Sequence, residues 1–332
     1  MLARDLIEAP GISEVDFLDP GATSADLKEC RLVVGCWGDN ARSDRYWAEK
    51  SIISDTDYLS IGYGADALDA LGALDAKAVA AGRTVLMGCN FSPGLTNLLA
   101  AFTRADLQQI KSVRLAYVLS ATGAFGQMGL ARAVSSRSSP ALVYKDGALH
   151  EQPSGTAQEK VFFPEPIGWK TVGLCRGAEA VVIPRALGNV GEVRVKNGVA
   201  EPALASLLRP AMVSRNGNGA RPLWDRVIDS IPPIRPNSPA WSAARVDVAG
   251  ESAGASESVA YGIADSLPNL LSATVLTAVR LMAGGSLRPG AVFPDQVFDP
   301  GAFFALLAQR GPRVARLTRF GDRPGPKSAA AG

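Results

Sequence analysis

The chain has 332 residues, enough for two packed domains or for one large domain with an insertion. Its hydrophobic fraction of 47% and charged fraction of 20% are those of a folded globular protein and exclude wholesale disorder. The formal net charge is only +2 and there is no large basic block, which argues against nucleic acid as the main partner.

Membrane and metal chemistry are also disfavoured by the sequence. No apolar stretch is long enough to cross a bilayer, and polar residues interrupt the best candidate, residues 270–282. Arg4, Asp5 and Glu8 stand where a signal peptide would need apolar residues, so we expect a cytoplasmic protein without a membrane partner. The cysteines show no paired metal-ligand spacing and there is one histidine, so no metal site is predicted.

The first hundred residues alternate short apolar runs with amphipathic ones, a pattern typical of parallel strands joined by helices. Strands are expected at residues 31–35, 57–61 and 84–88. A helix is predicted over residues 65–81, with Gly82 ending it. Ser92 as a cap and Pro93 as the first helical residue predict another helix, to about Thr103.

The middle of the chain is rich in β-forming segments. They lie at residues 112–119, 141–145, 160–163, 171–174 and 180–183, with a hairpin of 244–249 and 257–263 and short helices near 202–208 and 222–228. Asp146-Gly147 predicts a further hairpin, which places His150 on a strand and makes histidine-centred catalysis a poor hypothesis.

The final segment is helical again. Ser266 and Pro268 begin one amphipathic run to Met282, and Asp299-Pro300 begins a second through Leu307. The predicted fold class is α/β: a partial Rossmann-like parallel sheet, an inserted and mostly antiparallel α+β domain, and C-terminal helices that return to the first domain. The predicted domains are 1–108, completed by helices of 265–320, and an inserted substrate or dimerisation domain at 109–264. A flexible tail is expected at 321–332.

The segment 87–97 combines a strand end with a helix start. Open α/β sheets bind ligands at this edge, and a helix start offers free backbone N–H groups. The predicted substrate-binding residues are Asn90, Phe91, Ser92, Pro93 and Gly94. An ordinary strand-to-helix turn explains the same residues about equally well. On the ligand interpretation, Gly94→Val should block the ligand while leaving the fold largely intact.

Several short motifs resemble those of the saccharopine dehydrogenase-like proteins. They are the strand, turn and helix of residues 58–97 with Gly62-Tyr63-Gly64 and Ser92-Pro93-Gly94-Leu95-Thr96-Asn97, the segment 161–168, Ala260-Tyr261-Gly262, Arg288-Pro289-Gly290, Phe293-Pro294-Asp295 and Asp299-Pro300. The resemblance spans about residues 20–312. It implies a Rossmann domain that binds NAD(P), an inserted domain that supplies the substrate cleft, and oxidation or reduction of a small metabolite.

The sequence departs from the family at its start. Members begin with a strand and a G-x-G-x-x-G loop, whereas the first plausible strand here is residues 14–20, which resembles the family's third strand. Either the chain starts late, so that Met1 is not the true start, or conventional nucleotide binding has been lost. Gly62-Tyr63-Gly64 opens a G-x-G-x-x-A match, but no acidic residue ends the following strand, so the match is weak.

The predicted cofactor-binding residues occupy two loops after strands. They are Gly35, Cys36, Trp37, Gly38, Gly62 and Gly64. Glycines allow close backbone approach, and Trp37 is suited to wall a planar ring. If the cofactor has been lost, a tryptophan that covers the sheet edge is the better interpretation of Trp37. The catalytic candidates are Tyr63, Asn90 and Asn97.

Two functional hypotheses follow. The first is an NAD(P)-dependent oxidoreductase, of the kind found in secondary metabolism, acting on a C–N or C=C bond of a small-molecule substrate. The second is a cofactor-free relative. It would be a binding or scaffold protein, forming a homodimer through the inserted sheet, or a non-redox enzyme that reuses the pocket.

Overall fold

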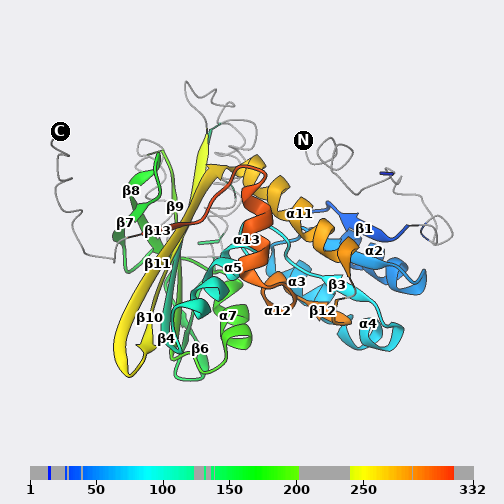
Figure 1. The fold of residues 1–332 in the computed structure, drawn as a ribbon, viewed down its shortest axis with the longest axis horizontal. Coiled ribbons are helices and arrows are strands. Elements are labelled where there is room, and N and C mark those ends of the chain that lie inside the picture. Colours follow the sequence, from blue (N-terminus) through cyan, green and yellow to red (C-terminus); the bar gives the residue numbers. More distant parts are fainter. Residues whose placement is uncertain are drawn as a thin grey trace.

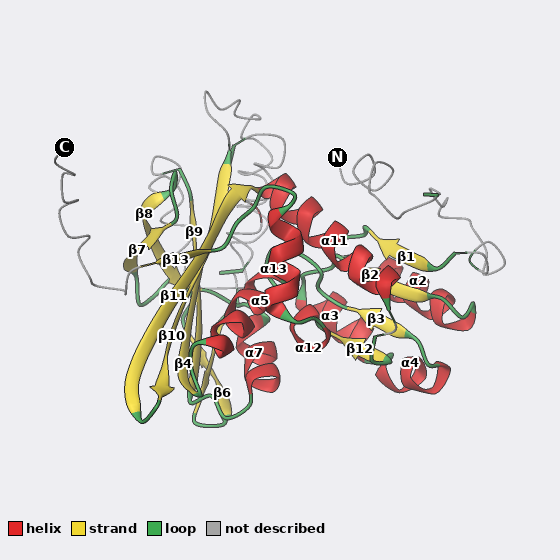
Figure 2. Ribbon diagram, in the orientation of Figure 1, coloured by secondary structure: helices red, strands yellow, loops and turns green. Residues whose placement is uncertain are grey.

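The computed structural model describes residues 14–15, 27, 30–38, 40–122, 131, 136–137, 139–201, 240–285 and 287–317. Within them the chain forms two β-sheets with helices packed between and around them (Figures 1 and 2). The segments predicted at 14–20, 202–208, 222–228 and from 321 onward lie wholly or largely outside the described residues.

The smaller sheet is entirely parallel. Its strands are β1 (Leu32–Gly35), β2 (Asp57–Ser60), β3 (Thr84–Leu86) and β12 (Gly290–Val292), in the order β1-β2-β3-β12. The three strands expected in the first hundred residues are confirmed. The fourth strand, β12, was not predicted from the sequence; through it the last part of the chain returns to this sheet (Figure 1).

Three helices cover one face of the parallel sheet. They are α2 (Ala41–Ile53), α3 (Ala65–Gly72) and α4 (Asp75–Ala81). The single helix predicted over 65–81 is therefore wrong: the chain breaks before Asp75. Leucines three residues apart drift about 60° around a helix at each step, so the break lets Leu68, Leu71 and Leu74 all stay buried.

The larger sheet has nine strands and is mostly antiparallel. They are β4 (Gln109–Leu119), β5 (Ala141–Lys145), β6 (Ala148–Gln152), β7 (Glu159–Phe163), β8 (Gly168–Leu174), β9 (Glu192–Val199), β10 (Trp241–Ser252), β11 (Ala255–Ser266) and β13 (Ala315–Leu317). The main order is β13-β11-β10-β4-β9-β5-β6, with β8 also on β9 and β7 on β8. Among the strands that the structure describes in this sheet, only β4 and β9 pair in parallel. The hairpin predicted at Asp146-Gly147 joins β5 to β6.

The strand predicted at 180–183 is wrong, because these residues belong to helix α7 (Glu179–Leu187). Val181, Val182 and Ile183 are β-branched and favour a strand locally. Burial at positions 179, 180, 182, 183 and 187 instead follows a helical period, and the helix packs on α5 (Leu95–Phe102) and on β9. Tertiary packing overrides local preference here.

The C-terminal helices match their predicted caps. Ser266 caps α11 (Leu267–Gly284) and Asp299 caps α13 (Pro300–Ala308), each accepting a bond from a backbone N–H. Between them lies the short helix α12 (Pro294–Val297). Among the described residues, α11 alone is long and apolar enough to cross a membrane, and 61% of that stretch is buried within the protein, as in a core helix.

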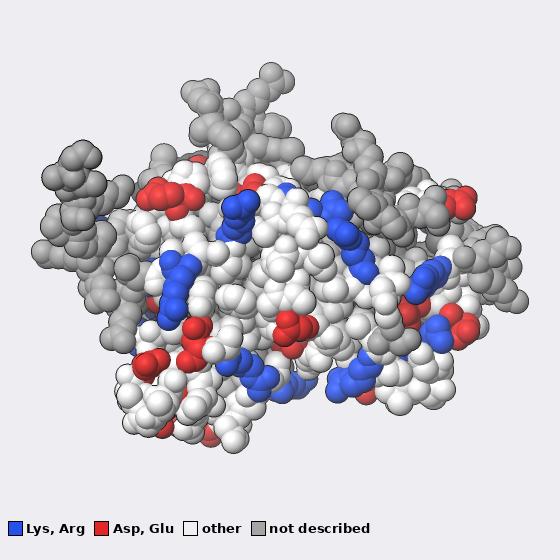
Figure 3. All heavy atoms as spheres, in the orientation of Figure 1, with Lys and Arg blue, Asp and Glu red and all other residues white. Residues whose placement is uncertain are grey.

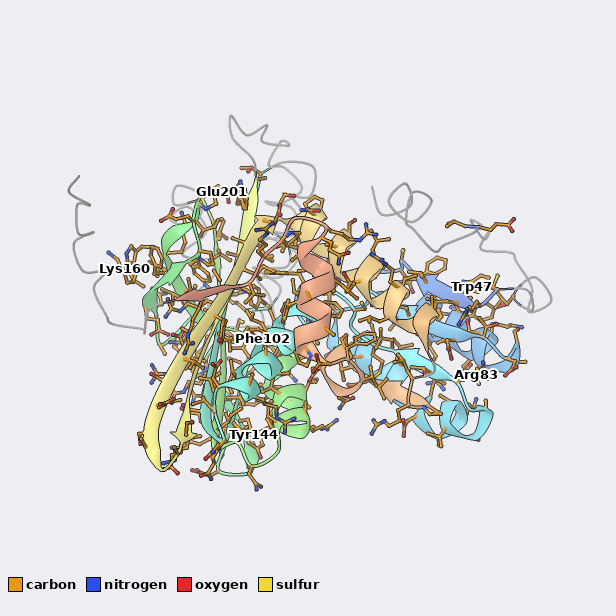
Figure 4. The ribbon with its side chains drawn as sticks, in the orientation of Figure 1. Trp47, Arg83, Phe102, Tyr144, Lys160 and Glu201 are labelled. Carbon is orange, nitrogen blue, oxygen red and sulfur yellow. The ribbon has the colours of Figure 1, made fainter. Side chains whose placement is uncertain are left out.

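The two sheets share one hydrophobic core. It gathers side chains of α5, α7, α11 and α13 against one face of the larger sheet and reaches Leu59 and Leu86 of the parallel sheet. Phe102 of α5, labelled in Figure 4, joins this helix to the larger sheet and to α13: its ring packs edge-on against Tyr261 of β11 and Phe304 of α13, at 5.1 and 5.4 Å between centroids. On the face drawn in Figure 3, basic and acidic side chains are interspersed.

Candidate functional site

The loops that follow the four parallel strands lie side by side at one edge of the sheet. Backbone hydrogen bonds continue between them beyond the strands, from Ile61 N to Gly35 O at 3.2 Å and from Cys89 N to Ser60 O at 2.8 Å. The order of the strands therefore brings together the loop after β1, the Gly62–Gly64 loop, the Asn90–Gly94 turn and the start of α12. This is the edge at which open α/β sheets bind ligands.

A buried carboxyl group lies beneath the first two loops. Asp44 of α2 is fully buried; its Oδ1 accepts from the Tyr58 hydroxyl at 2.6 Å and its Oδ2 from Ser60 Oγ at 2.5 Å. Ser60 Oγ also accepts the Gly62 N–H at 2.9 Å. Burial raises the pKa of Asp44 above its ordinary value, and the two hydroxyl donors lower it in part.

The predicted glycines Gly35 and Gly62 pack directly on this group. A Cβ at Gly35 would overlap the Tyr58 hydroxyl, and a Cβ at Gly62 would lie 2.7 Å from Asp44 Oδ2. Packing within the protein therefore requires glycine at both positions. The Gly62 N–H, already bonded to Ser60, is not a free donor for a phosphate.

The remainder of the β1 loop is more open. Cys36 is exposed, and Trp37 stacks almost parallel to Trp47 of α2, with ring centroids 6.2 Å apart. Gly38 has a φ of +60°, and no atom lies within 4 Å of where its Cβ would be. Trp47 is labelled in Figure 4. The next residue of the loop, Asp39, lies outside the described residues.

The Asn90–Gly94 turn is closely packed. Asn90 Nδ2 donates to Ile61 O at 2.6 Å, and Asn90 Oδ1 accepts the Phe91 N–H at 2.6 Å. Phe91 is fully buried, with its ring edge-on to Tyr117 of β4. Asn90 and Phe91 therefore fix the shape of the turn in this structure, and their predicted contact with substrate remains a prediction.

Ser92 does not cap the following helix. Helix α5 begins at Leu95 with Gly94 as its N-cap residue, so Pro93 lies before the helix rather than in its first turn. The Ser92 hydroxyl instead donates to Glu179 Oε1 at 2.5 Å, and the Thr96 hydroxyl donates to the same oxygen at 2.8 Å. Glu179 is fully buried at the start of α7, so it ties the turn to the helix that precedes β9.

The expectation that Gly94 merely leaves space for a ligand is also wrong. Gly94 has a φ of +116°, and a Cβ there would overlap Gly88 O and lie 2.6 Å from Asn90 O. Its missing side chain allows the turn to close on itself. A valine at this position would disrupt the turn rather than only block a ligand.

The catalytic candidates occupy different places. Asn97 is buried in α5, and its Nδ2 donates to Asp295 Oδ1 of α12 at 3.3 Å. Tyr63 is half-buried in the loop after β2, whereas Asn90 belongs to the loop after β3. His150 is exposed on β6, at the edge of the larger sheet and opposite Val143. Within the described residues, no group of three His, Cys, Asp or Glu side chains gathers as a metal site requires.

No role was predicted from the sequence for three acids of this edge: the buried Asp44 and Glu179, and the half-buried Asp295, whose Oδ2 atom is buried. Asp44 had a usable signature, because it stands in the helical stripe of buried residues 44, 47, 48, 51 and 52. An acid inside such a stripe indicates a buried polar contact. Glu179 had no comparable signature, because the β-branched residues that follow it predict a strand rather than a helix.

Comparisons with known proteins extend the finding on the fold. The sequence matches no family model and no curated protein. The structure is similar to saccharopine dehydrogenase (L-Glu forming) from Saccharomyces cerevisiae, with a TM-score of 0.60, 13% identity, and coverage of 92% of this chain and 88% of that one. It is also similar to homospermidine synthase from Legionella pneumophila in complex with NAD, with a TM-score of 0.57, 10% identity, and coverage of 94% and 83%. The resemblance drawn from short motifs is thus confirmed at the level of the fold.

The buried carboxylate predicts an unequal response of two tyrosines to loss of their hydroxyls. Tyr58→Phe leaves Asp44 Oδ1 buried without a donor and should lower the free energy of unfolding by about 1–3 kcal/mol. Tyr261→Phe is the matched control, since Tyr261 donates at 2.6 Å to Asp106, which is partly exposed and near Arg316. It should lose at most about 1 kcal/mol. Urea denaturation measures both; equal losses would contradict the importance given to Asp44.

The packing of Gly94 predicts a large effect of one methyl group. Gly94→Ala combines a left-handed φ with backbone overlap and should cost more than about 2 kcal/mol of stability. Gly82→Ala has a similarly positive φ of +66° in open space and should cost only about 1 kcal/mol. Thermal and chemical unfolding of both variants test this, and a Gly94 variant as stable as the Gly82 variant would show that the turn can relax.

Proposed function

We propose that this protein is an oxidoreductase that uses a nicotinamide cofactor. The observation that carries the proposal is the likeness of fold, which extends over more than nine-tenths of the chain. One of the two similar structures is a dehydrogenase by name, and the other was solved with NAD. The adjacent strand-end loops provide the edge at which such a fold binds its ligand.

The residues of this edge fit a nicotinamide ring better than they fit a pyrophosphate. Gly38 leaves its backbone open, and Trp37 lies next to it, already stacked on Trp47, as one wall for a planar ring. Gly62, in contrast, has its N–H bonded to Ser60 and its Cα against Asp44. We therefore place the ring over the loop of Gly35, Cys36, Trp37 and Gly38. The Gly62–Gly64 loop then serves as a neighbouring contact.

The cofactor supplies hydride transfer, and the chain supplies positioning. On this proposal Tyr63, Asn97 and the turn from Asn90 to Gly94 face a small metabolite whose C–N or C=C bond is oxidised or reduced. A cytoplasmic location, a part in secondary metabolism and a homodimer belong to the same proposal.

The packing of Gly35 and Gly62 favours a second candidate function. Tyr58 and Asp44 fill the space beside these glycines, so the protein itself explains why both residues are glycine. A cofactor-free binding protein, or a non-redox enzyme using the same edge, is consistent with that observation. The two functions differ in whether a nicotinamide cofactor binds.

Titration calorimetry and thermal shift with NADH and NADPH separate them. We expect one of the two cofactors to bind with measurable heat and to raise the unfolding temperature of wild type, because binding to the folded state stabilises it. Absence of both effects at millimolar cofactor, with a folded protein, would refute the redox proposal and favour the cofactor-free one.

A pair of glycine variants locates the site. Gly38→Ala and Gly147→Ala both place a methyl group in open space at positive φ, +60° and +84°, so each should cost about 1 kcal/mol of stability. Only Gly38 lies at the proposed edge; Gly147 is in the β5–β6 turn. We expect Gly38→Ala alone to weaken cofactor binding, by about tenfold. Equal affinities would place the cofactor elsewhere.

A further inference from the structure

Asn97 and Asp295 form an incomplete hydrogen-bonded pair at the carboxyl edge of the parallel sheet. Asp295 stands three residues after β12, on α12, and Asn97 lies on the facing helix α5. Asn97 Nδ2 donates to Asp295 Oδ1 at 3.3 Å. The second oxygen of each group, Asn97 Oδ1 and Asp295 Oδ2, is buried and has no hydrogen-bond partner.

An ionised Asp295 cannot repair this arrangement. A carboxylate only accepts hydrogen bonds, and the amide oxygen also only accepts, so neither orphaned oxygen can satisfy the other. Leaving two buried polar atoms unpaired is unfavourable. One proton on Asp295 Oδ2 supplies the missing donor. The acid then donates to Asn97 Oδ1 while Asn97 Nδ2 continues to donate to Asp295 Oδ1.

We propose that Asp295 is a proton-binding site, held as a neutral carboxylic acid by a two-bond pair with Asn97. The hydrogen bond made by this proton links Asp295, which follows β12, to Asn97 of α5, the helix that follows β3. It therefore lies at the edge where the strand-end loops meet. This inference rests on the donors and acceptors of the pair and does not depend on the proposed cofactor.

The electrostatic surroundings favour the neutral form. Together these surroundings raise the pKa of Asp295 to about 7: burial is the largest cause and the nearby Glu179 also raises it, while the hydrogen bonds that the carboxyl group accepts lower it in part. The packed elements provide few other charges: α5 carries no titratable side chain, and α12 carries only Asp295. On α7, Glu179 is in the first turn and Arg185 in the last. Asp299, which follows α12, is exposed.

The direction of the pH effect follows from linkage. The folded protein keeps the Asp295 proton up to a pH of about 7, whereas an ordinary aspartic acid loses it near 3.8. Between these values the native state binds more protons than the unfolded state at this residue. The contribution of Asp295 to stability therefore declines as pH rises through this window, and it is constant above about pH 7.

Asp295→Asn tests the site, with Asp299→Asn as the matched control. An amide at 295 can donate to Asn97 Oδ1 and accept from Nδ2 at every pH, so it mimics the neutral acid. Asp299→Asn also removes one acid close by and keeps a good helix cap. We expect the unfolding temperature of wild type and Asp299→Asn to fall more steeply than that of Asp295→Asn between about pH 5 and about pH 8.

Infrared spectroscopy gives the direct readout. At about pH 6, wild type and Asp299→Asn should show the C=O stretch of a protonated carboxylic acid that Asp295→Asn lacks. Absence of that band from wild type, or identical pH slopes for Asp295→Asn and wild type, would overturn the proposal. If Asp295→Asn does not fold, Asn97→Ala tests the proposal instead. This variant removes Asn97 Oδ1, the acceptor of the proposed acid hydrogen bond, so the C=O stretch of protonated Asp295 should shift. An unshifted band would show that Asn97 does not pair with the acid.

Discussion

A buried carboxyl group must be hydrogen-bonded, and the edge of the parallel sheet is built around this requirement. Asp44 takes hydroxyl donors from Tyr58 and Ser60, at the start and end of β2. Glu179 takes them from Ser92 and Thr96, which flank the start of α5. Each acid thus determines where a strand-end loop lies. The shape of the edge follows from buried hydrogen bonds as much as from the strands.

The same interactions connect the two sheets. Glu179 belongs to the helix between β8 and β9 of the larger sheet, yet its donors lie beside the parallel sheet. The continuous core and the ring contacts of Phe102 reinforce this connection. The bond from Ser92 to Glu179 is therefore a direct contact between the Asn90–Gly94 turn and the helix that leads into β9 of the larger sheet.

The elements that could be predicted from sequence are those whose local and tertiary preferences agree. The short apolar strands, the hairpin at Asp146 and the capped helices α11 and α13 belong to this class. The break before Asp75 and the helix at Glu179 do not, because burial of Leu74 and packing on β9 decide them. For the site, the sequence predicted which loops lie at the edge of the parallel sheet but not which side chains contact one another there. The hydrogen-bond partners of these side chains are distant in sequence. No spacing pattern along the chain predicts a contact such as that between Ser92 and Glu179.

Glycines show most clearly how one sequence pattern can have two physical causes. Glycines after a strand are typical of nucleotide loops, where a ligand needs close approach to the backbone. Here the Cα atoms of Gly35, Gly62 and Gly94 abut Tyr58, Asp44 and the carbonyl of Gly88, so each glycine is already required by the fold. Gly38 is different, because it has a positive φ and open space beside it. Gly82 and Gly147 share these two properties, but of the three only Gly38 lies in a loop at the carboxyl edge of the parallel sheet. The loop after β1, rather than the G-x-G match after β2, therefore has backbone at this edge that a ligand can approach.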